Sequence, residues 1–224
     1  MQRRNPQKTK KKILPACTIC GLWESFCVCP LLPRINSRVE ILLIQHSSEL
    51  LRQSNTGRLV AKMVTPSEII SWGAAGIPFN AAALKKPDTN YLILYPGSST
   101  RVLEPEDVQG PRGEKTCLVL LDATWGQARS MSRRIPQIQG LPFLSLPQEQ
   151  APVWKLRRSP APGYCCTLEA TIRALSVIHG NSLSSPLLLA LELVMARSLH
   201  MRGKITKNEM EEACEPVIER LLPS

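Results

Sequence analysis

Short runs of consecutive apolar residues set the strongest limit on how this chain can fold. Cys117–Leu121 has the sequence CLVLL, Tyr91–Tyr95 has YLILY, and Arg38–Ile44 has RVEILLI. A strand in which nearly every residue is apolar is buried on both faces, and such strands occur mainly in parallel sheets that helices cover on each side. Leu141–Leu146, which Pro147 follows, is a fourth predicted strand. The sequence therefore predicts a parallel sheet.

Helical patterns alternate with these strands and then continue to the end of the chain. Thr167 is a plausible N-cap, Gly180 should end the helix that follows it, and Thr206 with Glu209 forms a capping box. The expected helices lie at 46–64 with a break at 55–57, at 123–135, at 167–179, from 185 onward and from 206 onward. Strand–helix alternation followed by helices is typical of the α/β class.

Charge is distributed unevenly along the 224 residues, which carry 28 Lys and Arg against 18 Asp and Glu, a net charge of +10. Residues 1–12 hold six basic residues and no acidic one, as in a flexible tail or a phosphate-seeking arm. Residues 129–158 hold six basic residues against one acidic residue, a net +5. Two basic clusters on one chain favour a polyanionic partner, most commonly RNA or DNA.

No segment of the sequence is expected to cross a membrane or to direct secretion. The longest apolar run, Pro186–Ala196, contains Glu192 and is shorter than the roughly 20 residues of a membrane helix. The basic residues near the N-terminus are not followed by the apolar stretch of a signal peptide. A hydrophobic content of 43% is ordinary for a globular protein. A soluble, cytoplasmic protein is expected.

Four of the eight cysteines form a dense cluster with the spacing C-x2-C-x6-C-x-C, namely Cys17, Cys20, Cys27 and Cys29. Four thiols at this spacing are typical of tetrahedral zinc, and Gly21 permits the tight turn after the second ligand. An iron–sulfur cluster also takes four thiolates and stays the alternative. Because four protein ligands leave no open coordination position, the predicted zinc site is structural.

The common nucleotide-binding fingerprints are absent from the sequence. The segment 110–116 is similar to a phosphate-binding loop, but no glycine directly precedes Lys115 and the segment comes before a strand. No G-x-G-x-x-G motif follows a predicted strand. The sequence therefore excludes an obvious NTPase or a Rossmann-type dehydrogenase.

Chemically useful side chains follow the strand Cys117–Leu121. Asp122, Thr124 and Trp125 supply a carboxylate, a hydroxyl and a large aromatic ring within four residues. Ligands of open α/β sheets bind beyond the carboxyl ends of the strands, so these side chains are placed to meet a ligand. Asp122 or Thr124 can instead cap the helix that follows. The residues alone leave both interpretations open.

Several motifs in the chain resemble those of the DTW-domain family and occur in the same order. Asp122-Ala123-Thr124-Trp125, followed by Gln127-Ala128-Arg129, strongly resembles the D-x-T-W motif that defines the family. The other similar segments are the four-cysteine cluster, His46-x-x-Glu49, Asn55-Thr56-Gly57-Arg58-Leu59, Tyr95-Pro96-Gly97 and Thr167-Leu168-Glu169-Ala170. Cys165-Cys166 departs from the pattern and receives no role. The resemblance extends from Cys17 to the helix after Thr167.

The resemblance implies a tRNA-uridine aminocarboxypropyltransferase with a SPOUT-like, knotted and mostly parallel α/β fold. Such an enzyme transfers the 3-amino-3-carboxypropyl group of S-adenosylmethionine to N3 of a uridine and releases 5′-methylthioadenosine. The implied units are a basic arm at 1–14, a zinc-type segment at 15–33 and a catalytic domain at 34–224. The expected partner is tRNA, with no membrane and no obligate protein partner. An RNA methyltransferase and a non-catalytic zinc-containing RNA-binding module stay as alternatives.

The resemblance also names the candidate site residues. Asp122 is the candidate general base for N3 or orients the uracil or the donor's ammonium, and Trp125 can stack on uracil or face the sulfonium. Thr124 is the third candidate catalytic residue. The candidate donor-binding residues are Tyr95, Pro96, Gly97, Leu121, Thr167 and Glu169. The candidate RNA contacts are Asn55, Thr56, Arg129, Arg133, Arg134, Arg157 and Arg158. Their structural alternatives are a core position for Trp125, helix capping for Thr167 and Glu169, a helix-breaking turn at 55–57 and a solvated surface for the arginines.

Overall fold

Six parallel strands form the sheet at the centre of this protein. The computed structural model describes residues 15–97, 100–110, 113–147, 153–154, 156 and 165–222. The strands are β1 (Ile35–His46), β2 (Val64–Trp72), β3 (Thr89–Leu94), β4 (Arg101–Val102), β5 (Lys115–Asp122) and β6 (Phe143–Ser145). They are arranged in the order β2-β1-β5-β3-β6-β4, and each adjacent pair is parallel. The predicted parallel α/β architecture is confirmed, whereas the knot stays a prediction.

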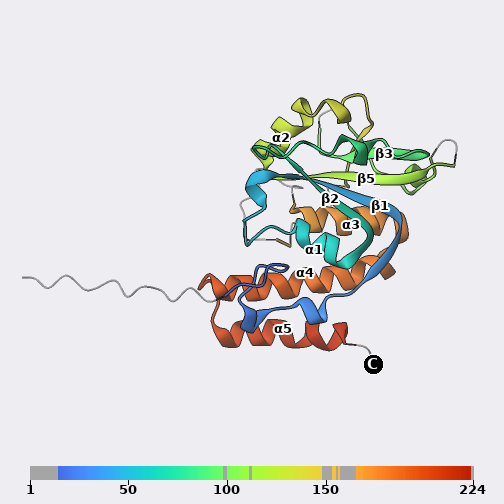
Figure 1. Cartoon of the computed structure of the whole chain (residues 1–224). Coiled ribbons are helices and arrows are strands. Elements are labelled where there is room, and N and C mark those ends of the chain that lie inside the picture. The colour runs from blue at the N-terminus through green and yellow to red at the C-terminus, as the bar shows by residue number, and fades with distance from the viewer. Residues whose placement is uncertain are drawn as a thin grey trace, which may run out of the picture.

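Helices cover both faces of the sheet, as Figure 1 shows. One face carries α2 (Trp125–Arg134), and the other carries α1 (Gly57–Met63), α3 (Thr167–His179) and α4 (Asn181–Met201), with α5 (Lys207–Leu221) packed against α4. The short 3-10 helices are η1 (Glu24–Phe26), η2 (Cys29–Leu31), η3 (Ser47–Glu49), η4 (Ala81–Leu84), η5 (Pro105–Val108) and η6 (Pro136–Ile138).

The unbroken apolar runs divide between two cores because successive strand residues point to opposite faces of a sheet. In β1, Ile41 and Leu43 join the core beneath α1, α3 and α4. Leu42 and Ile44 join the core beneath α2, and all four side chains are fully buried. The strand β5 follows the same alternation. An apolar run without polar interruptions therefore fills both cores at once.

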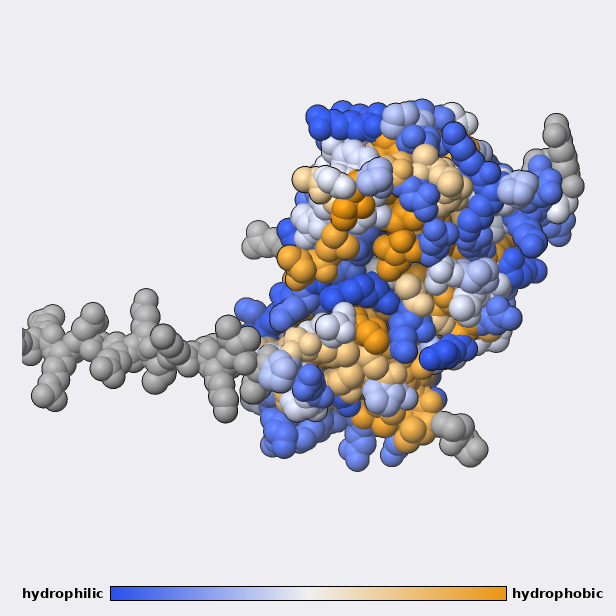
Figure 2. Space-filling view, viewed as in Figure 1, coloured by the Kyte–Doolittle hydropathy of each residue, from blue (hydrophilic) through white to orange (hydrophobic). Residues whose placement is uncertain are grey.

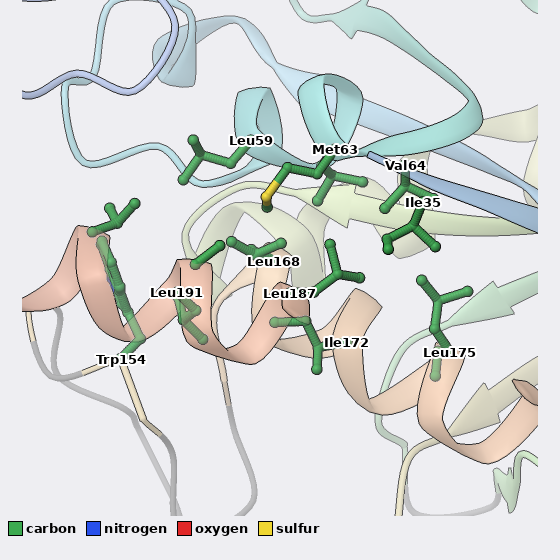
Figure 3. Packing of buried hydrophobic residues seen from close by; sticks show 14 of the residues in the cluster. Ile35, Leu59, Met63, Val64, Trp154, Leu168, Ile172, Leu175, Leu187 and Leu191 are labelled. Carbon is green, nitrogen blue, oxygen red and sulfur yellow. The ribbon is translucent and has the colours of Figure 1, made fainter. Parts of the chain in front are cut away.

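Apolar packing fixes α1 against α3 and α4. Leu59 and Met63 of α1 lie toward Leu168 of α3 and Leu187 of α4, and each of the four side chains is at most 1% exposed (Figure 3). Burying one large aliphatic side chain stabilises a fold by roughly 1.5–3 kcal/mol. These contacts hold the first turns of α1 and α3 in fixed positions, and both turns border the site described below.

The four-cysteine segment packs into the same core. Leu22 and Val28 are buried against it. The Trp23 amide donates a hydrogen bond to Sδ of Met201 at 3.4 Å, at the end of α4. Arg197 of α4 donates to two backbone carbonyls of the segment, those of residues 26 and 27, at 3.0 and 3.1 Å. The segment is therefore anchored to the helical layer.

The helix predicted for residues 46–64 is largely wrong. Only Gly57–Met63 is helical, because Ser47–Glu49 form a 3-10 turn and Val64 already begins β2. The strand β2 was not predicted because its sequence has no apolar run. It lies at the edge of the sheet, and most of its residues are partly exposed. The two-residue strand β4 was also not predicted.

The C-terminal helices agree with prediction except at two starting points. Cys166, not Thr167, is the N-cap of α3, and Gly180 ends that helix at φ 75°. The next helix begins at Asn181, so Pro186 lies inside α4. The capping box predicted for the last helix is present, since Thr206 and Glu209 bond each other's backbone amides.

By length and composition alone, α4 is long and apolar enough to cross a membrane, and the sequence expectation that no segment does so stays a prediction. Half of its apolar window, 50%, is buried inside the protein. The helix packs between α3 and α5, and hydrophilic and apolar side chains are intermixed over the lower half of the molecule (Figure 2). The apolar character of α4 is accounted for by its place in the core.

Candidate active site

A cavity of about 500 Å³ opens at the carboxyl edge of the sheet. Its walls come from the ends of β3 and β5, from the first turn of α2, from residues just before α1 and from the start of α3. This volume lies within the roughly 300–1,000 Å³ that is usual for small-molecule sites. The position beyond the strand ends is the one expected for a ligand of an open α/β sheet.

Asp122 lies at the base of this cavity and accepts three hydrogen bonds. Its Oδ2 accepts from Nε2 of Gln45 and from Nδ2 of Asn55, both at 2.7 Å. Its Oδ1 accepts from the hydroxyl of Thr167 at 2.6 Å. The Asp122 side chain is buried, with 2% of the residue exposed. All three donors are neutral, so they solvate the carboxylate without cancelling its charge.

The local sequence explains how the carboxylate reaches these donors. Gln45 and Asp122 are paired across the adjacent strands β1 and β5, so the register alone brings them together. Gly57 opens α1 directly against Asp122, and a Cβ atom there would lie 2.5 Å from Oδ2. Glycine is therefore required at this position by space, which gives a physical reason for the glycine in the N-T-G sequence.

A second buried carboxylate, Glu49, holds the loop that carries Asn55. Its Oε2 accepts from Nδ2 of Asn55 at 3.1 Å, and its Oε1 faces Nε of Arg52 at 3.4 Å. The imidazole Nδ1 of nearby His46 accepts from the Ser48 amide at 3.1 Å. The Asn55 amide group thus lies between two carboxylates and fixes the end of this loop beneath the cavity.

Glu169 lies behind the cavity wall and does not line the cavity. Its carboxylate accepts from the backbone amides of Val153 at 2.9 Å and Trp154 at 3.3 Å, and it pairs with Arg173 at 2.8 Å. Trp154 does line the cavity. The direct contact of Glu169 with the donor's amino group stays a prediction, and the described contacts make Glu169 the residue that holds Trp154 in place.

Aromatic and capping groups complete the wall. Tyr95 and Trp125 both line the cavity, with ring centroids 6.5 Å apart and planes inclined by 44°. Thr124 lines it too, but its hydroxyl donates to Oε1 of Gln127 at 2.7 Å, and its amide donates to the same oxygen. Thr124 is therefore the N-cap of α2, as the alternative interpretation of the sequence expected. The Gln127 amide in turn donates to Ser48 at 2.8 Å.

The other candidate residues separate into three groups. Pro96 and Leu121 line the cavity with Thr167, whereas Gly97 does not and bonds Thr100 instead. Asn55 and Thr56 were expected to approach the tRNA or the donor. Both are buried: Asn55 bonds Asp122, and Thr56, which lines the cavity, accepts a hydrogen bond from an α3 backbone amide. The exposed candidates are Arg129, Arg133 and Arg134 on α2, while Arg157 and Arg158, like the basic arm, lie outside the described residues.

Cys165 and Cys166, which received no role from the sequence, both line the cavity. Burial raises the pKa of each thiol to about 12. Both groups are therefore neutral thiols at pH 7, and a neutral thiol is a poor nucleophile. The two cysteines contribute shape to the wall and no reactive thiolate.

The four-cysteine cluster brings its sulfurs together in the way that a single metal ion requires. The four Sγ atoms lie within 4.8 Å of one another, and the pairs Cys17–Cys29 and Cys20–Cys27 are 3.7 and 3.8 Å apart. A tetrahedral zinc with Zn–S bonds of about 2.3 Å separates its sulfurs by about 3.8 Å. Burial raises the pKa of Cys20 and of Cys29, so a bound cation would hold these groups as thiolates. The cluster is compatible with structural zinc.

Sequence reasoning missed several residues of the site. Gln45 directly follows the apolar run of β1, just as Asp122 follows that of β5, so the rule used for Asp122 would also have found it. Glu49 was noted only as part of a motif, and its bond to Asn55 depends on how the loop turns. No pattern marks Trp154, because it lies in no predicted element.

A covered parallel sheet with a buried carboxylate lining a cavity at its carboxyl edge is the arrangement in which α/β proteins bind small ligands. The sequence profile described as DTW domain matches residues 14–199, and the chain belongs to this family. The family predicted from the D-x-T-W motif is therefore confirmed.

The relatives of this chain include proteins named tRNA-uridine aminocarboxypropyltransferase 2 from several animals. The mouse protein (Mus musculus) is 27% identical over 75% of this chain and 58% of its own length. The Drosophila melanogaster protein is 29% identical over 74% of this chain and 67% of its own. This chain thus spans about three-fifths to two-thirds of these relatives. Among solved structures, the SAM-dependent rRNA:acp-transferase Tsr3 from Vulcanisaeta distributa matches with a TM-score of 0.49 and 16% identity over 83% of this chain and 98% of that one.

Replacing Gly57 with alanine tests the close approach of α1 to Asp122. We expect Gly57→Ala to displace the carboxylate and to weaken ligand binding in the cavity at least tenfold, because the new Cβ would lie 2.5 Å from Oδ2. The matched control is Gly126→Ala in α2, where a Cβ would meet no atom within 4 Å. Calorimetric titration with S-adenosylmethionine, the donor that the sequence predicts, measures both variants. Equal binding by both variants would contradict the packing described.

Replacing one cysteine of the cluster tests the metal site. We expect the purified protein to contain about one zinc ion per chain and Cys17→Ser to lose it, because three thiolates hold the ion less tightly than four. Cys214→Ser is the matched control, since Cys214 is buried in α5, outside the cluster. Metal analysis by mass spectrometry gives the stoichiometry. Iron with the absorbance of a cluster would show that the zinc assignment is wrong.

Proposed function

We propose that this protein transfers the 3-amino-3-carboxypropyl group of S-adenosylmethionine to N3 of a uridine in tRNA and releases 5′-methylthioadenosine. Membership of the DTW family and the names of the two relatives support this proposal. The structural observation that carries it is the charged base of the cavity, because the group transferred comes from a cationic donor.

Asp122 gives the cavity a negative charge that its three described hydrogen-bond donors do not cancel. Among the residues that the structure describes, no Lys, Arg or His forms a salt bridge with this carboxylate, in contrast to Glu49 and Glu169. A buried anion without an ion pair attracts a cation strongly, because little water screens it. S-adenosylmethionine supplies two positive groups, the sulfonium and the α-ammonium. The rings of Tyr95 and Trp125 add cation–π attraction at the wall.

The reaction requires one bond to form and one to break. N3 of uracil attacks the γ-carbon of the methionine moiety, the bond from that carbon to sulfur breaks, and the sulfur leaves as the neutral thioether of methylthioadenosine. The N3 proton must leave as well. An ionised carboxylate has about four acceptor positions, and the described donors occupy three on Asp122, so one position on Oδ1 is open to receive that proton.

The surface beside the cavity suits a nucleic acid. Trp125 and Ala128 of α2 line the cavity, and Arg129, Arg133 and Arg134 are exposed on the same helix. Arginine binds phosphate groups through paired hydrogen bonds, and such contacts orient a nucleic acid without reading its sequence. In this proposal Arg129 holds the tRNA backbone while the uridine enters the cavity, where Trp125 offers a face for stacking.

A product analysis with one isosteric substitution tests the proposal. We expect wild-type protein, S-adenosylmethionine and unmodified tRNA to yield a uridine heavier by one aminocarboxypropyl group, together with methylthioadenosine. Asp122→Asn keeps the shape of the side chain and loses its charge, and should reduce turnover by roughly 100-fold or more. Mass spectrometry of digested nucleosides measures the product.

Asp107→Asn is the matched control, because this carboxylate pairs with Arg101 outside the cavity and should leave turnover unchanged. Adenosylhomocysteine as the by-product would identify a methyltransferase instead. Unmodified tRNA with intact binding would identify a non-catalytic RNA-binding module.

A further inference from the structure

Arg58, at the start of α1, joins two parts of the chain. One is the four-cysteine segment, residues 15–33, and the other is the loop of residues 50–56, which carries Asn55. Nη1 of Arg58 donates to the carbonyl of Thr18, between the first two cysteines, at 2.7 Å. Its Nη2 donates to the carbonyl of Arg52 at 2.9 Å and to that of Gln53 at 3.4 Å. The guanidinium is planar and rigid, with several donors in one plane, so one side chain sets the distance between these two segments.

A second, independent contact brings the same two segments together. Gly21, in the turn after Cys20, lies so close to the loop that a Cβ there would be 2.1 Å from the carbonyl oxygen of Gln53. Gly21 also adopts φ 73°, a conformation that favours glycine. The turn at Gly21 therefore contacts the backbone of the loop at Gln53 directly. A conformational change in this turn must displace either the loop or the four-cysteine segment.

The loop ends at the residue that binds Asp122. The backbone amide of Arg58 donates to Oδ1 of Asn55 at 3.3 Å, which leaves Nδ2 of Asn55 to donate to Asp122 and Glu49. A continuous path of hydrogen bonds thus leads from the cysteines to the carboxylate, from Thr18 through Arg58 to Asn55. None of its members other than Asn55 touches Asp122.

We propose that Arg58 is a positioning residue through which the folded four-cysteine segment sets the orientation of Asn55 at Asp122. Metal in the cluster then supports the site from a distance, by keeping the carbonyl of Thr18 where the guanidinium can hold it. This inference deepens the proposed function, on which its kinetic readout rests. Its structural readout, the mobility of the loop, does not depend on any activity.

The test combines Arg58→Ala with Cys17→Ser. We expect Arg58→Ala to retain zinc yet to accelerate amide hydrogen exchange in residues 50–58 and to lower kcat roughly tenfold, as loss of a charged hydrogen bond does. Cys17→Ser should have the same two effects, and the double variant should be no worse than the stronger single one. Effects that act through one path are not additive.

Arg197→Ala is the matched control. Arg197 binds the same segment from α4, through the carbonyls of residues 26 and 27, and none of its described hydrogen bonds reaches residues 50–56. It should leave exchange in residues 50–58 at the wild-type level. Arg58→Lys, which retains the charge and part of the donor set, should fall between wild type and Arg58→Ala, and it replaces Arg58→Ala if that variant does not fold.

Three results would overturn the inference: unchanged loop exchange in the Arg58 variants, additive effects with Cys17→Ser, or equal loop exchange in Arg197→Ala and Arg58→Ala. A wild-type protein that transfers nothing would contradict the proposed function alone. The exchange measurements would then still decide whether Arg58 positions the loop.

Discussion

One buried carboxylate, held by three neutral donors, determines the arrangement of the site. The donors of Asp122 come from β1, from the loop before α1 and from the first residue of α3, so three separate parts of the fold must meet at one point. A buried anion is strongly destabilising unless hydrogen bonds replace its water. Three features bring them together. The sheet register places Gln45 beside Asp122, Gly57 at the start of α1 leaves room for the carboxylate, and apolar packing holds α1 against α3.

The charges of the protein fall into two regions of opposite sign. The cavity is lined by an anion and by aromatic rings, which suits a cationic small molecule. The exposed face of α2 beside it carries arginines, which suits a polyanion. A net charge of +10 therefore does not describe the site itself, because none of the basic residues that the structure describes lines the cavity.

Features that depend on neighbouring residues could be predicted from the sequence, and features that depend on folding could not. The buried strands, the cysteine cluster and the capping box at Thr206 each arise within a short segment. The same rule that marks Asp122 also marks Gln45 as a residue at the carboxyl edge, but which side chains bond Asp122 could not be predicted, because strand register brings Gln45 to it and loop geometry brings Asn55 to it. For the same reason the sequence placed Asn55 at an RNA surface, whereas the structure buries it.

The most direct test of the role of Asp122 compares the affinities of the cavity for two similar ligands, one with a positively charged sulfur and one with a neutral sulfur. S-adenosylmethionine and S-adenosylhomocysteine differ by a methyl group and by the positive charge on sulfur. Calorimetric titration should show that the wild-type protein prefers the sulfonium by roughly tenfold, about 1.4 kcal/mol, and that Asp122→Asn largely loses this preference. Equal affinities in the wild type, or an unchanged preference in the variant, would contradict the account.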